Sequence, residues 1–419
     1  MKVLIIGSVW PEPNSSGASL RMQELMQLFV RQQWQVEFAS AATESEFMAD
    51  LDAFGVQSRT IKLNDSSFDR FLEAYRPDLV LFDRFTMQEQ FGWRVAKVCP
   101  DALQLLETID LHFLRQARHM VFKRQAQVVQ HVEKSDLFNE VAVREVAAIL
   151  RSDLSILVSD YEEALLQRQF SVDSSLLHLC PFMFSRDQIH RDTAAFEERQ
   201  HFVTIGNFRH APNWDAVLWL KQEIWPKIRV RLPRAELHIY GAYTPPRATA
   251  LHQPRDGFLI KGRAASVSEL MQSARVCLAP LRFGAGIKTK LADAMLNGTP
   301  NVTTSMGIEG MSGHCNWSGL IADEADSFAE QAIALYQNHR LWQQCQQNGF
   351  DIITALFDEA TNGEALVQRI RQVRENLAEH RLNNFTGAML RSHHHRSTEF
   401  MSRWIEAKNR LVQESTPGV

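Results

Sequence analysis

The sequence has few cysteines, and they form no recognisable motif. Its 419 residues include only five: Cys99, Cys180, Cys277, Cys315 and Cys345. Their number is odd, and no two of them form a C-x-x-C pair, which argues against a disulfide framework and against a structural zinc knuckle. Cysteine usage of this kind is typical of a reducing compartment.

The sequence also lacks long apolar runs and an excess of one charge. No stretch approaches the roughly 18 apolar residues of a membrane span, and the run at residues 3–6 is too short for a signal peptide. We therefore expect a cytoplasmic protein, with peripheral contact at the inner face of a membrane as an open alternative. Lys and Arg number 45 and Asp and Glu 49, a formal net charge of −4. This balance argues against a protein that coats nucleic acid, which would carry a basic face.

Strands and helices alternate along the first half of the chain. Residues 3–6 form an apolar run that ends at Gly7, which is typical of a strand buried on both faces of a parallel sheet. Further strands are predicted at 35–39, 79–82, 103–106 and 156–158, with helices at 19–31 and within 113–150.

A second alternating series follows a charged stretch that has no apolar periodicity. Strands are predicted at 201–206, 236–240, 258–261, 275–279 and 301–303, and helices at 213–231 and 287–296, with Asn213 as a candidate N-cap. The two series predict an α/β protein with two Rossmann-like, doubly wound parallel sheets that face each other across a cleft.

These patterns divide the chain into four predicted parts. They are an N-terminal domain (1–184), a linker (185–200), a C-terminal domain (201–362) and a helical tail (363–419). The tail either crosses back to the first domain or forms a partner surface. It contains His393-His394-His395, for which a solvated helix face is a better prediction than a metal site.

The most informative stretch is residues 280–298, P-L-R-F-G-A-G-I-K-T-K-L-A-D-A-M-L-N-G. It follows a predicted strand and opens a helix, and it contains Gly284, Gly286, Lys288, Lys290 and Asp293. The glycines permit close approach of a ligand, and the helix N-terminus together with the lysines favours an anion. The aspartate could accept hydrogen bonds from a ribose. The spacing is not that of a P-loop, and a glycine loop beside two solvated lysines is an equal alternative.

This stretch resembles the donor-binding region of glycosyltransferase family 4. One branch of that family carries G-A-G-I-K-x-K, then E-A-M-x-x-G-x-P-V-V-x-T and G-x-E-G, and this chain continues with D-A-M-L-N-G-T-P-N-V-T-T-S-M-G-I-E-G. Residues 202–217, F-V-T-I-G-N-F-R-H-A-P-N-W-D-A-V, and 233–241, P-R-A-E-L-H-I-Y-G, are also similar to the family. So are residues 13–25 and the D-L-H of 110–112. The resemblance spans roughly residues 1–311.

The resemblance implies a fold and an activity. Family members have the GT-B fold, in which the N-terminal domain lies on the acceptor side and the C-terminal domain binds the nucleotide sugar. A protein of this kind is a retaining, hexosyltransferase-type enzyme of the sort found in polysaccharide biosynthesis. Its partners would be a nucleotide-diphosphate sugar and a glycan, lipid-linked or protein acceptor. We expect no cofactor, no metal and no nucleic-acid partner.

The resemblance also implies roles for individual residues. The donor-binding residues would be Gly17, Gly206, Arg209, Gly284, Gly286, Lys288, Thr289, Lys290 and Asp293. Arg209 and Lys288 would neutralise the departing diphosphate, and Asp293 would hold the ribose. Asp110 and His112 would act at the donor sugar and acceptor as catalytic residues.

The chain departs from the family pattern at the first of two glutamates spaced E-x7-E. Those two positions are Ala285 and Asp293 here, so the first carboxylate is missing. A non-catalytic sugar-nucleotide-binding subunit and a sugar-nucleotide epimerase on the same fold therefore remain alternatives.

Three other features carry weaker predictions. Asp50-Leu51-Asp52 resembles a D-x-D metal motif, but a solvated helix face is the better interpretation. Trp214, Trp219 and Trp225 are predicted to be mostly core anchors rather than a base-stacking platform. Tyr243 and Arg263 follow strand ends and are candidates for the border of the nucleotide base.

Overall fold

The computed structural model describes residues 1–12, 15 and 17–414 of the chain. For residues 393–395 and 412–414 the structure describes the backbone alone. The predicted histidine triplet His393–His395 and residues 13, 14 and 16 of the N-terminal motif therefore fall outside the described residues.

The N-terminal domain is built on a seven-stranded parallel sheet with the strand order β3-β2-β1-β4-β5-β6-β7. Its strands are β1 (Lys2–Gly7), β2 (Gln35–Ser40), β3 (Val56–Thr60), β4 (Leu79–Asp83), β5 (Leu103–Glu107), β6 (Leu154–Leu157) and β7 (Leu177–Leu179). Its helices are α1 (Gly17–Arg31), α2 (Ser67–Tyr75), α3 (Phe85–Val98), α4 (His112–Gln125), α5 (Lys134–Leu137), α6 (Glu140–Arg151) and α7 (Asp160–Phe170). The inner strands are buried on both faces, which explains their continuous apolar runs.

The C-terminal domain has a six-stranded parallel sheet with the order β10-β9-β8-β11-β12-β13. Its strands are β8 (Gln200–Ile205), β9 (Leu237–Tyr240), β10 (Phe258–Gly262), β11 (Ala274–Ala279), β12 (Asn301–Thr303) and β13 (Gly319–Ile321). Its helices are α8 (Ala211–Trp219), α9 (Trp225–Arg231), α10 (Pro246–Thr249), α11 (Val267–Ser273), α12 (Thr289–Leu296), α13 (Ser305–Ile308), α14 (Ala325–Gln337) and α15 (His339–Leu356). The predicted fold class, two doubly wound parallel-sheet domains, is therefore confirmed.

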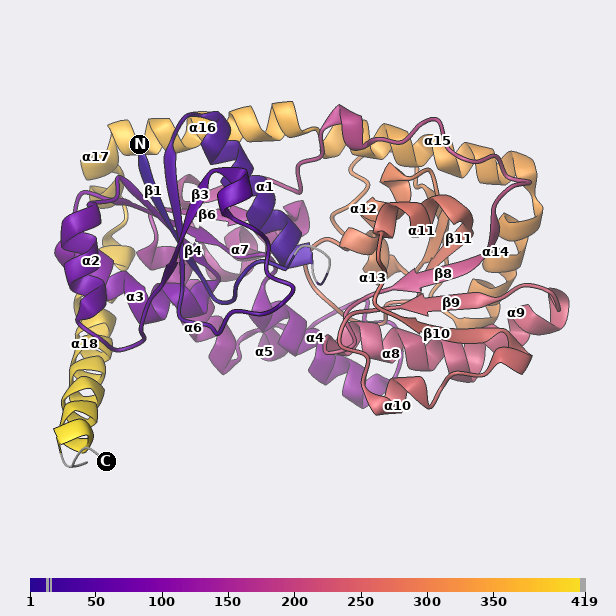
Figure 1. The fold of residues 1–419 in the computed structure, drawn as a ribbon, viewed down its shortest axis with the longest axis horizontal. Coiled ribbons are helices and arrows are strands. Elements are labelled where there is room, and N and C mark those ends of the chain that lie inside the picture. Colours follow the sequence, from indigo (N-terminus) through magenta and orange to yellow (C-terminus); the bar gives the residue numbers. More distant parts are fainter. Residues whose placement is uncertain (13–14, 16, 415–419) are drawn as a thin grey trace.

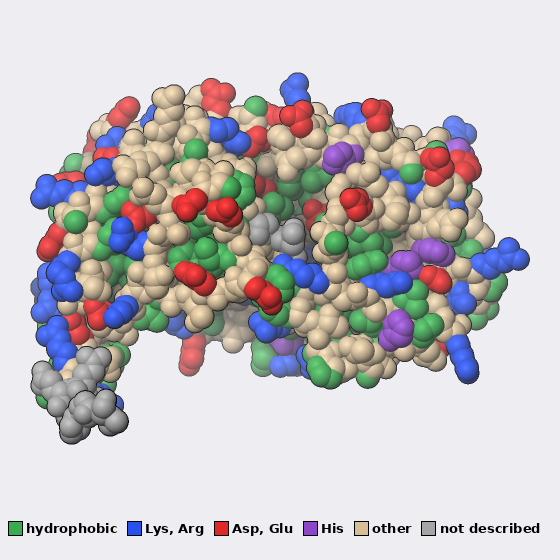
Figure 2. Space-filling view, in the orientation of Figure 1, with side chains coloured by type: hydrophobic (Ala, Val, Ile, Leu, Met, Phe, Trp, Pro, Cys, Tyr) green, Lys and Arg blue, Asp and Glu red, His purple; other side chains and the backbone are tan. Residues whose placement is uncertain are grey.

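The C-terminal segment runs back over the N-terminal domain (Figure 1). Helix α16 (Glu359–Glu375) buries Leu366, Val367, Ile370 and Val373 in the same apolar core as β1 and α1. Helix α17 (Leu377–Leu382) follows, and α18 (Phe385–Glu414) descends along the outer side of the N-terminal domain. Lys and Arg side chains gather on that edge of the molecule, over α2, α3 and α18 (Figure 2).

Several boundaries differ from the sequence-based predictions. The strands β3, β7 and β13 were not predicted, because each lies at the edge of its sheet and has exposed or partly exposed residues, so it lacks a continuous buried run. Gln200 already belongs to β8, and α16 begins at Glu359. The domain boundaries themselves stay predictions.

Two helix starts also differ. The prediction of Asn213 as an N-cap is wrong: His210 caps α8, and Asn213 lies in its first turn beside Pro212. Helix α12 begins at Thr289 rather than residue 287, because Lys288 has extended dihedral angles and is the N-cap. The predicted helix 213–231 contains a π-helical segment at Leu220–Ile224, directly before Trp225 and Pro226. A proline has no amide hydrogen to donate within a helix, which accounts for the irregularity.

The weaker predictions have mixed outcomes. Trp219 and Trp225 are buried in the core, whereas Trp214 is partly exposed and packs against it. Residues 52–54 form only a single 3₁₀ turn, so the predicted helix face is not present there. Among the described residues, no helix is long and apolar enough to cross a membrane.

Arg381 fastens the returning segment to the N-terminal sheet. Its guanidinium donates to both oxygens of the buried Asp153, at 2.8 and 2.7 Å, and to the carbonyl of Ala102 at 2.8 Å. We predict that Arg381→Ala lowers the free energy of unfolding by roughly 2–4 kcal/mol, because it leaves a buried carboxylate without its cation. Arg374→Ala breaks the exposed pair with Asp78 and should cost only about 0.2–1 kcal/mol. Urea unfolding followed by circular dichroism measures both; equal effects would contradict the assigned role of Arg381.

Candidate functional site

The carboxyl ends of the two sheets face a common cleft of about 590 Å³. Ligands of open α/β sheets bind at this end of the strands. Ten of the eleven predicted site residues line the cleft: Gly17, Asp110, His112, Gly206, Arg209, Gly284, Lys288, Thr289, Lys290 and Asp293. The remaining residue, Gly286, does not line the cleft, because it is buried against Ile109 and Asp110 of the N-terminal domain. The structure thus brings the predicted residues together, while their functional roles stay predictions.

The N-terminus of α12 provides the anion-binding geometry of the cleft. The amides of Thr289 and Lys290 belong to the first turn and have no acceptor within the helix. They lie at the positive end of the helix dipole. An anion in the cleft next to these residues would receive hydrogen bonds from the backbone alone.

Two lysines, Lys288 buried and Lys290 partly buried, add charge at the same place. Lys288 Nζ donates to the carbonyl of Gly286 at 2.6 Å, and Lys290 Nζ donates to Asn213 Oδ1 at 2.8 Å. Neither forms an ion pair with a carboxylate of the described residues. Burial lowers the pKa of each ammonium to about 8. Because no ion pair neutralises either ammonium group, this wall of the cleft favours an anionic ligand.

Asp293 lies one turn further along α12 and also lines the cleft. Burial raises the pKa of its carboxyl group to about 7. A carboxylate in this environment gains from hydrogen-bond donors such as the hydroxyl groups of a ribose, because they replace lost hydration.

Arg209 occupies the rim of the cleft. Its side chain is exposed and its guanidinium stacks 3.8 Å from the ring centroid of Tyr243. The hydroxyl of Tyr243 in turn donates to Glu12 of the N-terminal domain at 2.8 Å. The predicted phosphate contact would thus be made by a guanidinium that Tyr243 already holds in place by stacking.

Two glycines allow the domains to approach closely. A Cβ atom on Gly17 would lie 2.5 Å from Thr289 Oγ1 in the opposite domain. Gly286 has a φ of 63°, and a Cβ there would lie 2.8 Å from the Cβ of Asp110. Any larger side chain at either position would force the domains apart.

Asp110 and His112 form the N-terminal side of the cleft. Arg115 Nη1 lies 3.0 Å from Asp110, and His112 Nε2 lies 3.6 Å from the same carboxylate. Burial alone would raise the pKa of Asp110, but the charge of Arg115 and its neighbours outweighs burial and holds the pKa below its ordinary value. Burial lowers the pKa of His112 to about 4. At neutral pH the pair is thus an ionised carboxylate and a neutral imidazole.

Sequence reasoning missed two buried glutamates behind this loop. Glu162 accepts hydrogen bonds from the amides of Leu111, at 3.2 Å, and Gly286, at 2.8 Å, so it joins the two domains. Burial raises its pKa to about 7. Glu145 accepts from the amide of Phe113 at 2.9 Å and fixes the start of α4. No local pattern could have indicated these contacts, because they depend on the tertiary fold.

An ion pair between the domains was missed as well. Arg118 on α4 donates to both carboxylate oxygens of Glu309, at 2.7 and 2.6 Å, and to the carbonyl of Gly284 at 2.9 Å. Glu309 belongs to the G-I-E-G segment that follows the glycine loop. The pair anchors that loop to the N-terminal domain.

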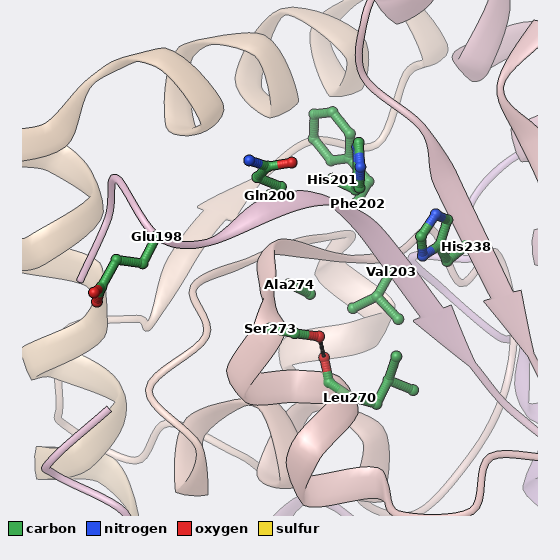
Figure 3. Close-up of a pocket in the computed structure, with 9 residues that line it drawn as sticks. All are labelled: Glu198, Gln200, His201, Phe202, Val203, His238, Leu270, Ser273 and Ala274. Carbon is green, nitrogen blue, oxygen red and sulfur yellow. Dashed lines mark hydrogen bonds between the residues drawn. The ribbon is translucent and has the colours of Figure 1, made fainter. Parts of the chain in front are cut away.

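A second, smaller hollow of about 250 Å³ lies at the opposite end of the C-terminal sheet (Figure 3). His201, Glu236 and His238 form the only group of described residues with the composition and spacing of a metal site. Their hydrogen bonds are already satisfied in part: His238 Nε2 lies 2.7 Å from Glu236, and His201 Nδ1 accepts the amide of Glu236 at 3.2 Å. That acceptor role places the proton of a neutral His201 on Nε2, the nitrogen nearest the Glu236 carboxylate. The group is best described as a hydrogen-bonded cluster at the amino ends of β8 and β9.

The close contact at Gly17 gives a test of the closed arrangement. We predict that Gly17→Ala separates the domains, because the added methyl group would lie within 2.6 Å of both Oγ1 and Cγ2 of Thr289. Small-angle scattering should show a larger radius of gyration. Gly17→Ala combined with Thr289→Ala removes both of those atoms and should restore the compact form. An unchanged radius for the single variant would contradict the close approach.

Residues 199–338 match the family model described as glycosyl transferases group 1. No curated protein has a significant sequence match to the chain.

Several solved structures have a similar fold. Sucrose-phosphate synthase from Thermosynechococcus elongatus has a TM-score of 0.67 at 18% identity, and the match covers 89% of this chain and 99% of the other. Anabaena HepE in complex with UDP-glucose has a TM-score of 0.65 at 14% identity, covering 89% and 100%. WaaG, a glycosyltransferase involved in lipopolysaccharide biosynthesis, has a TM-score of 0.60 at 12% identity, covering 86% and 97%. Residues 199–338 thus match the glycosyl transferases group 1 family, and the chain as a whole has the two-domain GT-B fold.

Proposed function

We propose that the protein transfers a sugar from a nucleoside-diphosphate sugar to an acceptor. The observation that carries this proposal is the start of α12, where the buried Lys288 and the partly buried Lys290 form no ion pair and lie beside the amides of the first helical turn. The charge and the hydrogen-bond donors of this wall suit a diphosphate. Anabaena HepE has been crystallised with UDP and UDP-glucose, which makes UDP and its sugars the first probes to use.

The chemistry of glycosyl transfer accounts for the arrangement. Breaking the bond between sugar and phosphate builds negative charge on the leaving diphosphate. Donors that are already oriented stabilise that charge most strongly in a cleft from which water is excluded. The ammonium of Lys288 and the amides of Thr289 and Lys290 would do so without a metal ion, and Asp293 would hold the ribose.

The N-terminal side of the cleft would act on the sugar. A neutral His112 can donate a hydrogen bond to a sugar hydroxyl, and the ionised Asp110 can stabilise positive character at the anomeric carbon. Both lie within the closed cleft opposite the glycine loop. We propose retention of configuration at that carbon, on the resemblance of the motifs to retaining enzymes.

We propose the location of the acceptor site on the same resemblance of the motifs. The N-terminal domain, residues 1–184, would bind a glycan, a lipid-linked sugar or a protein, and the C-terminal domain would bind the nucleotide. We propose no cofactor and no nucleic-acid partner, and we place the protein in the cytoplasm.

Two alternatives share the donor site but differ in the reaction. Ala285 stands at the position of the missing first glutamate, which favours a subunit that binds the donor without turnover. An epimerase would convert the nucleotide sugar without any acceptor.

A donor screen separates the three functions. UDP-, GDP- and dTDP-sugars are incubated with and without glycan, lipid-linked and peptide acceptors, in the presence and absence of a chelator. Transfer with the α-configuration retained, unaffected by the chelator, supports the proposal. A new nucleotide sugar formed without acceptor indicates an epimerase, and tight binding without turnover indicates a sensor. Absence of any nucleotide-sugar binding at millimolar concentration would reject all three.

Lys288→Ala tests the phosphate contact. We predict that it weakens UDP binding by about tenfold to a hundredfold, since a charge-assisted hydrogen bond contributes roughly 1.5–3 kcal/mol. The melting temperature should not fall, because the change removes a desolvated charge. The matched control is Lys261→Ala, at an exposed position of the same domain. Calorimetric titration with UDP measures both; equal affinities for the two variants would contradict the role.

The lysine pKa values predict a pH dependence. Both ammonium groups have pKa values lowered to about 8, so they are charged below that pH and lose their protons above it. UDP affinity should therefore fall as the pH rises above about 8, because both ammonium groups lose their charge there. Lys288→Arg keeps its charge over this range and should show a shallower fall. An affinity that stays constant well above pH 8 would exclude both lysines as phosphate ligands.

A further inference from the structure

The C-terminal helix exposes an unusual number of large apolar side chains. Between residues 382 and 411 these side chains have exposed fractions of 46% to 81%. We call those on α18 the apolar stripe: Phe385, Met389, Phe400, Met401, Trp404 and Leu411; Leu382 ends the preceding helix α17. A surface helix of a globular protein normally buries such residues.

The apolar stripe points away from the body of the protein. Phe385, Met389, Phe400, Trp404 and Leu411 are separated by four, eleven, four and seven residues, all close to whole turns of a helix. They therefore share one face of α18. The last turns of α18 also extend beyond the N-terminal domain (Figure 1).

The opposite face of α18 attaches the helix through polar groups. Ser402 is 3% exposed and its Oγ lies 3.2 Å from Arg94 Nη2 on α3. Asn384, just before the helix, donates to the carbonyl of Leu150 on α6 at 2.8 Å. The helix thus buries small and polar side chains and presents its apolar side outward, the reverse of the usual arrangement.

Positive charge borders the apolar stripe. Arg396, Arg403, Lys408 and Arg410 are exposed on α18. The nearby carboxylates are paired: Glu399 lies 3.0 Å from Lys97 and 2.6 Å from Arg403, and Glu406 lies 2.6 Å from Arg410. Arg396 and Lys408 form no ion pair with the described residues. Figure 2 shows the Lys and Arg side chains that continue along this edge of the molecule.

We propose that α18 docks onto the surface of an anionic phospholipid bilayer. The apolar stripe would enter the boundary between headgroups and acyl chains, with Trp404 at the headgroup level and the cations against the lipid phosphates. The helix lies on the membrane rather than across it, since none of the described helices is apolar enough to span one.

Charge favours a bilayer over a second copy of the chain. A symmetric dimer through the apolar stripe would bring its cationic borders onto each other, whereas anionic lipids supply the opposite charge over the whole face. The proposal does not rest on the proposed activity. It would hold the N-terminal domain at a surface where lipid-linked acceptors are found.

Vesicle flotation with the full-length chain tests the proposal. The probes are vesicles of phosphatidylcholine alone and vesicles that also contain phosphatidylglycerol. We expect flotation with the anionic vesicles, little with the neutral ones, and a decrease as salt is raised. Absence of binding to the anionic vesicles would overturn the proposal.

Substitutions locate the binding surface. Phe400→Ser combined with Trp404→Ser should weaken vesicle binding by more than about tenfold, because two aromatic side chains no longer enter the bilayer. Arg396→Ala combined with Lys408→Ala should reduce binding to anionic vesicles. Val230→Ser is the control, because Val230 is 81% exposed but lies on α9 in the other domain. All these residues are exposed, and circular dichroism and UDP titration confirm that each variant is folded.

Two outcomes would contradict the assignment. Vesicle binding that is unchanged in the Phe400→Ser and Trp404→Ser variant would place the contact elsewhere. A dimer in analytical ultracentrifugation that is lost in that variant, without vesicle binding by the wild type, would make the apolar stripe a self-association surface.

Discussion

The structure depends on two ammonium groups at the start of α12, one buried and one partly buried, that form no ion pair with a carboxylate of the described residues. Lys288 and Lys290 donate only to a carbonyl and to an amide oxygen, and both have pKa values lowered to about 8. Burial of charge opposes folding, and an anion bound at this place would offset that cost. The amides of Thr289 and Lys290, in the first turn of α12, lie beside these ammonium groups and would bind the same anion.

Closure of the two domains completes the cleft. Gly17 and Gly286 permit backbone approach, and Glu162 and the Arg118–Glu309 pair hold the glycine loop against the other domain. After the C-terminal domain the chain crosses back, and α16 packs into the apolar core of the N-terminal domain. The position of the donor site is thus set by contacts that are distant in sequence, and a change far from the phosphates can alter it.

The sequence predicted the parallel strands and the glycine loop well, because buried strands are continuous apolar runs and glycines precede helix N-termini. It placed ten of the eleven site residues on the cleft surface. It could not predict β3, whose exposed edge position carries polar residues, or the N-cap of α8, where His210 takes the place expected for Asn213. Glu145, Glu162 and Arg118 were missed because each acts on a backbone group or charge supplied by another element. The outward-facing apolar side of α18 was also invisible, since periodicity alone does not tell which face of a helix is covered.

The central claim is that a nucleoside diphosphate binds at the start of α12 with the domains closed around it. A crystal structure with UDP tests this directly. We expect phosphate oxygens within hydrogen-bond distance of the amides of Thr289 and Lys290 and of Lys288 Nζ. Gly17 should face the phosphates from the other domain. A nucleotide bound away from α12, with Lys288 still donating only to Gly286, would contradict it.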